Sequence, residues 1–165
     1  MTDVAAPPAV DAALRYFDAI GRQDLDEAVA CWKEGGIDHL APVGELRAPE
    51  GIRQYFGALF AAFPDFTYEV RDVIADGEKV VVWWRIRGTF TGASYDGVRA
   101  TGGGAVIEGL DYVRVEDGLI VRNDSYWDDS AVARQLGLLP AKGSRQERAL
   151  KGLLNLKTRL TRRRR

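Results

Sequence analysis

The stretch that decides the fold is residues 105–127, AVIEGLDYVRVEDGLIVRNDSYW. Apolar and polar residues alternate on both sides of Glu116-Asp117-Gly118, which predicts two antiparallel strands joined by a tight turn. One face of the first strand is apolar apart from a single acid, and consists of Ala105, Ile107, Gly109, Asp111, Val113 and Val115. This hairpin therefore predicts a half-buried sheet with one carboxyl group on its apolar side.

The isolated acid on that face, Asp111, has two interpretations. Burial disfavours the charged form, so the pKa of this carboxyl should rise, and a protonated acid can donate a hydrogen bond to a developing oxyanion. Alternatively, Asp111 serves structure alone and hydrogen-bonds Asn123 or a core hydroxyl. The residues by themselves leave both interpretations open.

The length of the turn determines what Asp111 faces. A three-residue loop over 116–118 pairs Val115 with Leu119 and puts Asp111 opposite Asn123. A two-residue turn would pair Asp111 with Asp124 instead. We favour the longer loop because it places one apolar set on the inner side, namely Leu119, Val121, Asn123, Ser125 and Trp127.

Working outward, the pattern before the hairpin is first helical and then extended. It predicts helices over 10–21 and 24–33 (the second capped by Asp24), a loop holding Asp38, His39 and Pro42, and a third helix from Pro49 to Pro64. It then predicts strands over 66–72 and 79–90, a glycine-rich loop over 92–104, and after the hairpin a short helix over 128–136. Helices followed by strands indicate an α+β fold, an antiparallel sheet with helices on one face.

Composition and charge narrow the function. The 165 residues, 46% of them hydrophobic, suit one domain with a hydrophobic core. The single cysteine excludes a disulfide within the chain, and the single histidine excludes a metal site built from several histidines of the chain. We predict neither cofactor nor metal. Neither a signal peptide nor a membrane-spanning run is visible, so we expect a cytoplasmic protein.

The net charge of −1 hides two opposed regions. Residues 142–165 hold ten Lys/Arg and one acid, for +9, and the remainder carries −10, which argues against nucleic acid binding by the domain. If the tail is helical, Leu150, Leu153, Leu154 and Leu160 fall near one face. It could then lie on an anionic membrane or an acidic surface, bind nucleic acid through its terminal arginines, or stay solvated. We divide the chain into a disordered arm (1–9), a domain (10–141) and this tail.

Several short motifs occur in a characteristic order between residues 10 and 140. They are RYF at 15–17 before DLD at 24–26, APVG at 41–44, GIR at 51–53 with AFPD at 62–65, GTFTG at 88–92, DYVR at 111–114 with DGLI at 117–120, and YWD at 126–128 leading to QLG at 135–137. In this order they resemble the ketosteroid isomerase and SnoaL-like polyketide cyclase families of the nuclear transport factor-like superfamily. The resemblance implies a cone of curved antiparallel sheet closed by about three helices.

The resemblance also implies roles for individual residues. Tyr16 and Asp111 match the pair that binds the substrate oxyanion in the isomerases. The isomerase base position is Ala41, the cyclase acid/base position is Ser125, and the position of the assisting cyclase histidine is Asp111. Because neither family's base is present, Asp38 or His39 is the candidate to move the proton. Alternatively, Asp111 itself could be the base if ionised, with Asn123 orienting it.

The predicted function follows from these assignments. The cone would bind an apolar carbonyl compound and catalyse proton transfer of isomerase, cyclase or hydratase/hydrolase type. Pocket residues would be Asn123, Ser125, Trp127, Phe56 and Phe60, and a homodimer would form through the sheet face of Trp83 and Arg85. The alternative is a ligand-binding or dimeric interaction module of this fold that has lost its chemistry.

Overall fold

A computed structural model describes residues 7–162 of the protein, so residues 1–6 of the predicted arm and 163–165 of the tail lie outside the described residues. The elements are α1 (Pro8–Gly21), α2 (Leu25–Ala30), β1 (Trp32–Leu40), β2 (Gly44–Arg47), α3 (Glu50–Ala62), β3 (Thr67–Asp76), β4 (Lys79–Thr89), β5 (Gly104–Glu116), β6 (Leu119–Trp127), α4 (Asp129–Gln135) and α5 (Arg145–Arg162). The α+β class is confirmed. The first helix begins at Pro8, inside the segment that we expected to be disordered.

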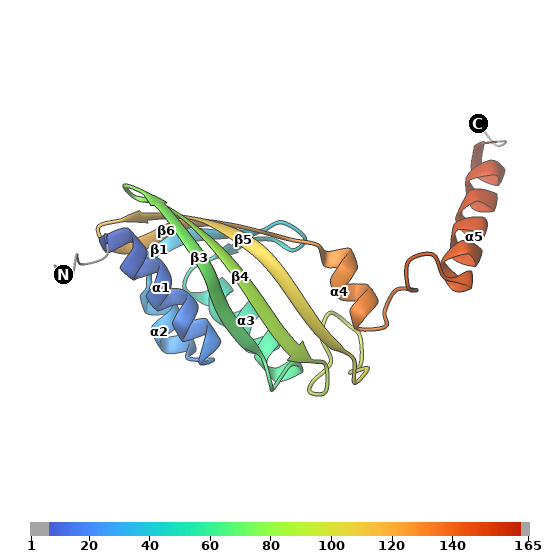
Figure 1. Cartoon of the computed structure of the whole chain (residues 1–165), viewed down its shortest axis with the longest axis horizontal. Helices are drawn as coiled ribbons and strands as arrows, with labels where there is room; N and C mark the ends of the chain where they lie inside the picture. The colour runs from blue at the N-terminus through green and yellow to red at the C-terminus, as the bar shows by residue number, and fades with distance from the viewer. Residues whose placement is uncertain (1–6, 163–165) are drawn as a thin grey trace.

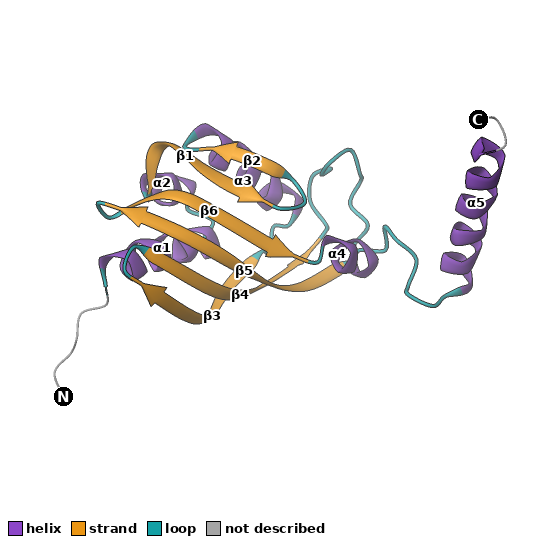
Figure 2. Cartoon of the chain, turned by 90° about the horizontal axis from the view of Figure 1, so that it is seen from above, coloured by secondary structure: helices purple, strands orange, loops and turns teal. Residues whose placement is uncertain are grey.

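One curved sheet organises the molecule, in the order β2-β1-β6-β5-β4-β3. Every neighbouring pair is antiparallel except β1 and β6, which are parallel. The sheet arches over α1, α2 and α3 without closing into a barrel (Figures 1 and 2). The core lies between these helices and the concave face, where Ile20, Ile52, Val82 and Ile120 are fully buried.

The register of the β5–β6 hairpin differs from both of our predictions. The turn has two residues, Asp117 and Gly118, both with positive φ, and it pairs Glu116 with Leu119. A bulge between Arg114 and Val115 in the pairing then shifts the register, so that Asp111 lies opposite Ser125 and not Asn123 or Asp124. On the side of the bulge away from the turn, the predicted inner face is correct, because Asn123 and Ser125 point inward. Between the bulge and the turn the prediction is wrong, because Ile120 is buried in place of Leu119 and Val121.

The segment that we predicted as a helix end and a loop is in fact a strand. The second helix stops at Ala30, and Asp38 and His39 lie on β1 between β2 and β6. Gly35, with φ of +76°, and Gly36 interrupt the strand pattern, and the pairing with β6 is irregular between Trp32 and Ile37. These two glycines hid the strand from a periodicity argument.

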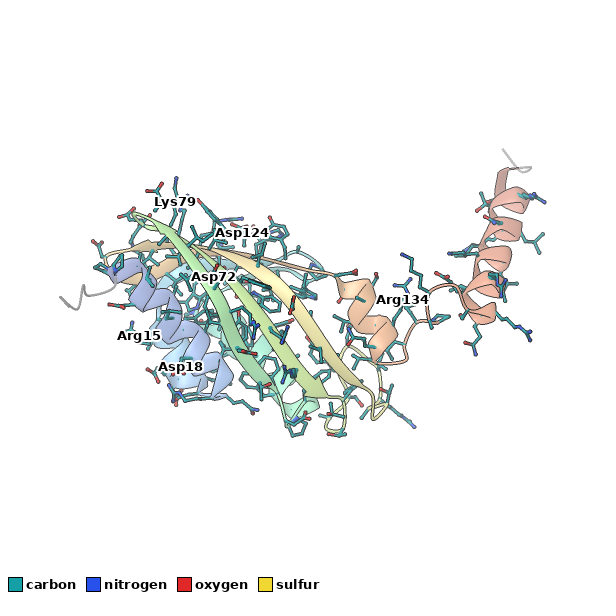
Figure 3. All side chains as sticks on the ribbon, viewed as in Figure 1. Arg15, Asp18, Asp72, Lys79, Asp124 and Arg134 are labelled. Atoms are coloured by element: carbon teal, nitrogen blue, oxygen red, sulfur yellow. The ribbon has the colours of Figure 1, made fainter. Side chains whose placement is uncertain are left out.

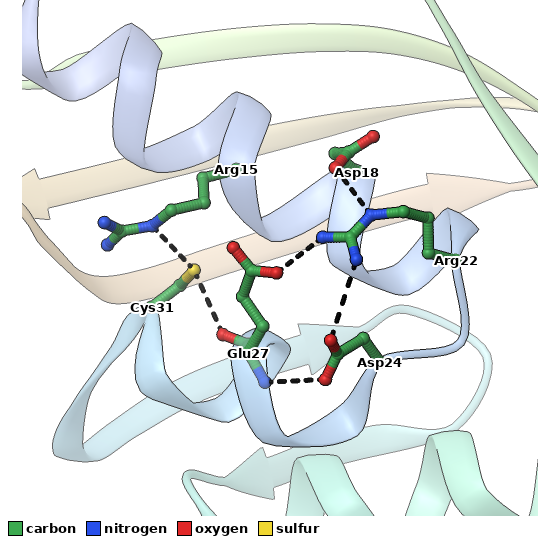
Figure 4. A network of polar contacts seen from close by, with 6 residues as sticks. All are labelled: Arg15, Asp18, Arg22, Asp24, Glu27 and Cys31. Atoms are coloured by element: carbon green, nitrogen blue, oxygen red, sulfur yellow. Dashed lines mark hydrogen bonds and ion pairs between the residues drawn. The ribbon is translucent and has the colours of Figure 1, made fainter.

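The corner between α1 and α2 is held by charge (Figure 4). Asp24 caps α2 as predicted, accepting a hydrogen bond from the Glu27 backbone N–H at 3.0 Å. Arg22 pairs with Asp18 at 2.9 Å and with Glu27 at 2.5 Å. Cys31, at the end of α2, accepts a hydrogen bond from Arg15 Nε at 3.3 Å and is buried. These contacts join α1, which carries Tyr16, to α2.

The convex face of the sheet and the C-terminal helix carry exposed apolar residues. Trp83, Leu110 and Tyr126 are neighbours across β4, β5 and β6 and are 41–54% exposed. Beyond α4, helix α5 extends away from the cone (Figures 1 and 2), with Arg134 of α4 lying between the two (Figure 3). In the described part of the chain, no helix is long and apolar enough to cross a bilayer.

Candidate active site

A cavity of about 660 Å³ fills the cone between α1, α3, α4 and the concave face of the sheet. Most of its wall is apolar or aromatic, with Phe17, Phe56, Phe63, Trp84 and Trp127 among its members. Its polar wall residues include a buried group from four different elements, namely Tyr16 of α1, Asp38 of β1, Asp111 of β5, and Asn123 and Ser125 of β6. An apolar pocket with a few convergent polar groups is the usual form of a small-molecule site.

Asp111 is the best-connected member of this group. Its carboxylate accepts hydrogen bonds from Trp84 Nε1 at 2.7 Å, from Asn123 Nδ2 at 2.8 Å and from the Ser125 hydroxyl. Burial raises the pKa of Asp111 to about 6, and the three donors partly oppose that rise because they favour the charged form. Asp111 therefore changes charge close to neutral pH.

Asp38 reaches the same point from the other side of β6. It lies opposite Asn123 in the parallel β1–β6 pairing and is fully buried. Its carboxyl accepts a hydrogen bond from Asn123 Nδ2 at 3.0 Å and from the Tyr16 hydroxyl at 3.4 Å. Burial raises the pKa of Asp38 well above its usual value, and the nearby charge of Asp111 raises it further. Of the two acids, Asp38 is therefore the one that burial and its neighbour's charge both favour in the protonated form.

Asn123 joins the two acids through one amide group. Its Nδ2 donates to both carboxyl groups, so Asp38, Asn123 and Asp111 form a continuous chain. Two carboxyl groups buried in one apolar site cannot both ionise without a large cost, so the pair holds one proton over a range of pH. This arrangement places a hydrogen-bond donor and a proton acceptor side by side.

Tyr16 of α1 adds a hydroxyl group to these buried polar residues. Its ring packs edge-on against Trp32 at 5.5 Å, and burial raises the pKa of its hydroxyl well above the usual value. The hydroxyl consequently stays protonated and serves as a donor. Tyr16 and Asp111 line one cavity, as the resemblance implied, and Asp38 stands between them as a second acid.

The predicted residues divide into those inside the cavity and those outside it. Asn123, Ser125, Trp127 and Phe56 all line it. Phe60 is not in the lining and packs between Phe56 and Phe66.

His39 points to the opposite face of the sheet from Asp38, which corrects our expectation that both would reach the mouth. Neighbouring residues of a strand alternate between faces, and the loop that we predicted there would not have imposed this separation. His39 Nδ1 lies 3.1 Å from Asp124 Oδ1 on the convex side. It is therefore removed from the cavity.

Sequence reasoning missed two polar groups in this wall. Trp84 was not among the predicted site residues, yet its indole N–H donates a hydrogen bond to Asp111. Tyr68 stacks on Phe17 at 5.2 Å, and its buried hydroxyl has no hydrogen-bond partner among the described residues. The role of Trp84 could have been recognised from its pairing with Gly109. A glycine opposite the indole leaves the ring room to lie across the neighbouring strand.

Comparisons with known proteins agree with this architecture. The structure is similar to a candidate SnoaL-like polyketide cyclase from Jannaschia sp. CCS1, with a TM-score of 0.73 and 21% identity over 85% of this chain and 100% of that one. It is also similar to IdmH from Streptomyces antibioticus, a candidate polyketide cyclase, with a TM-score of 0.68 and 27% identity over 78% and 98% of the two chains.

A third similar structure is AclR from Streptomyces galilaeus, a candidate hydroxylase, with a TM-score of 0.70 and 21% identity over 81% and 87% of the two chains. The search of curated proteins found no match. A family model described as the SnoaL-like domain matches residues 13–123, a stretch that runs from within α1 into β6 and contains Tyr16, Asp38, Asp111 and Asn123. The chain therefore belongs to the family of SnoaL-like domains.

Proposed function

We propose that the protein binds an apolar carbonyl compound in the cone and catalyses proton transfer at the carbon beside the carbonyl, leading to isomerisation or an aldol-type cyclisation. The observation that carries this proposal is the Asp38–Asn123–Asp111 chain at the polar wall of an apolar cavity. It supplies an acid and a base in one place, and family membership supports a small-molecule reaction on this scaffold.

The hydrogen bonds favour a division of labour that differs from the one predicted from the resemblance. Asp111 accepts from three donors, two of them N–H groups that cannot accept, so the contacts suit an ionised base. The charge of Asp111 raises the pKa of Asp38 further, so Asp38 suits the role of the acid. In this assignment Asp111 takes the proton, and Asp38 donates a hydrogen bond to the resulting oxyanion. Tyr16, whose O–H points to Asp38 in the free protein, turns that O–H to the oxyanion.

The proton inventory closes without another reactant. The Asp111 carboxylate takes the proton from the carbon beside the carbonyl, and the electron pair of that C–H bond moves to the carbonyl oxygen. In isomerisation, Asp111 returns the proton to a different carbon of the dienolate. In cyclisation, the enolate carbon forms a bond to a second carbonyl of the same molecule, whose oxygen receives the proton.

The walls limit the class of substrate. Aromatic rings from α1, α3, β4 and β6 surround the polar group, so a flat, largely apolar molecule of several rings fits the surface offered. The unpartnered Tyr68 hydroxyl is a further donor for an oxygen atom on such a molecule.

The test follows exchange of carbon-bound hydrogen for deuterium by NMR, using a panel of polycyclic ketones and phenols in D2O. Binding is measured in parallel by quenching of tryptophan fluorescence. We expect Asp111→Asn to lower the exchange rate by about 10²-fold or more, as for loss of a general base, while ligand affinity changes little. The control, Asp124→Asn, lies on the convex side of β6 and should exchange at the parent rate.

Two results would overturn the proposal. Ligands that bind tightly without any exchange in the parent protein would favour the non-catalytic binding module. Equal exchange in the parent and in Asp111→Asn would show that the base is another group.

A further inference from the structure

Helix α5 is joined to the rest of the protein at its beginning. Ser144 accepts a hydrogen bond from the Glu147 backbone N–H at 3.1 Å, and Glu147 Oε2 accepts from the Gly143 backbone N–H at 2.7 Å. Arg134 of α4 lies 3.7 Å from Glu147. Past these contacts the helix extends away from the cone (Figure 1), so its start is positioned by α4 and its remaining turns are free to meet a partner.

One face of α5 is apolar and open to solvent. Leu150, Leu153 and Leu154 follow the three- and four-residue spacing of a single helix face, and Leu156 borders them. Their exposed fractions are 41%, 67%, 55% and 55%. A contiguous exposed apolar stripe marks an interaction surface.

The opposite face of α5 is basic. At 100° per residue, Arg145, Arg148, Lys151 and Arg159 fall on the side away from Leu150, Leu153 and Leu154. Lys157 falls among the leucines, where its long apolar stem can lie along them and carry its charge outward. The acid of the segment, Glu147, is itself engaged by Lys151 at 3.1 Å and is mostly buried, so it subtracts little from the charge that a partner meets. The helix thus presents leucines on one side and most of its positive charge on the other.

Two further observations indicate what covers this helix. The exposed apolar residues continue from α5 towards the cavity, since Leu138 and Leu139 are 41% and 37% exposed and Leu138 lines the cavity. A nucleic acid would engage the arginines but leave the leucines in water. A surface that is negative outside and apolar beneath satisfies both faces, and an anionic lipid bilayer has this structure.

We propose that α5 docks on the surface of an anionic lipid bilayer, with its leucines among the acyl chains and its basic residues among the headgroups. The α4 side of the cavity then faces the same surface. The helix lies on the bilayer without crossing it. This inference does not depend on the reaction catalysed in the cone.

The test uses the full chain in vesicle flotation, with phosphatidylcholine vesicles and with vesicles containing one quarter phosphatidylglycerol. We expect binding to the anionic vesicles to be at least tenfold stronger and to weaken at 0.5 M NaCl. Arg148→Gln combined with Arg159→Gln should weaken anionic binding about tenfold or more. The matched control, Lys79→Gln combined with Arg114→Gln, removes two exposed charges from the sheet and should bind as the parent does.

The leucines need a separate variant, Leu153→Ser combined with Leu154→Ser, which should also lose binding. Because these residues lie outside the core, the thermal unfolding of the cone should be unchanged and would show that the variant is folded. Equal binding to both kinds of vesicle, or no binding to either, would overturn the proposal. So would self-association through α5 without vesicle binding, which would assign the stripe to a second copy of the chain, or binding to single-stranded RNA that survives the leucine changes.

Discussion

The wall of the cavity and helix α5 depart from the usual distribution of residues in opposite directions. The cavity holds two carboxyl groups within an apolar interior, whereas α5 holds four leucines among charges in water. Both arrangements cost stability, the first through desolvation and the second through exposed apolar surface. Such departures are concentrated where a protein binds another molecule. We therefore assign the cavity to a small molecule and the surface of α5 to a larger partner.

The largest effect should come from breaking the link between the two acids. Asn123→Leu removes the donor shared by Asp38 and Asp111 and leaves a buried charge with fewer partners, so we expect a loss of about 3–5 kcal/mol in the free energy of unfolding. Urea denaturation at pH 7 measures it. Asn155→Leu makes the same substitution on exposed α5 and should change stability by less than about 0.5 kcal/mol. Similar losses of stability in the two variants would contradict the view that the buried polar contacts lie in the cavity wall and not on α5.

A pH series tests whether the buried carboxyl groups of the cavity lower the stability of the protein when they are charged. The pKa of Asp111 is about 6 in the folded protein and about 3.9 in an unfolded chain, so the folded state binds the extra proton between those values. Stability from this group is complete below about pH 4 and is lost as the pH rises through about 6, by about 3 kcal/mol. Asp111→Asn should remove that component from urea denaturation curves recorded between pH 4 and 7.5. Parallel pH profiles of parent and variant would refute the assignment.

A smaller effect is expected where β5 makes room for Trp84. A methyl group on Gly109 would overlap the indole ring, and displacing the ring removes a donor from Asp111. We expect Gly109→Ala to cost about 2 kcal/mol and to shift the indole N–H resonance of Trp84 in NMR spectra. Gly104→Ala, at the start of the same strand, meets only one atom at 3.9 Å and provides the control. An unmoved indole resonance in Gly109→Ala would argue against this packing.

The smallest effect is expected on α5. Leu153→Ala should change the free energy of unfolding by less than about 0.5 kcal/mol in lipid-free buffer, because Leu153 makes no core contact. Leu40→Ala, the same substitution at a residue 4% exposed on the cavity wall, should cost about 2–4 kcal/mol. A large effect at Leu153 would show that α5 packs on the cone in solution.

Much of the fold could be predicted from the sequence because its signals are local. Alternation identified β3 to β6, and Asp24 marked the start of α2. The signals failed where the decisive fact was nonlocal or irregular. β1 was missed because Gly35 and Gly36 interrupt it and because its pairing with β6 is with a segment far along the chain.

The candidate site was predicted in composition more accurately than in geometry. An acid on an apolar face was enough to select Asp111, and the resemblance was enough to select Tyr16. The bulge beside Val115 could not be predicted from composition, and together with the two-residue turn it decides that Ser125 faces Asp111. The exclusion of His39 likewise followed only once residues 38 and 39 were known to lie on a strand.

The position of β6 between the two acids has a consequence for how the site assembles. Asp111 and Asn123 are 12 residues apart on one hairpin, so local contacts can bring them together early in folding. Asp38 and Asn123 are 85 residues apart and meet only when β1 closes against β6. Opening that seam, which carries only β1 and the edge strand β2, would separate the acid from the base while β3 to β6 stayed paired. The two acids therefore meet only when β1 is paired with β6, and a state that lacks this seam holds the base without the acid.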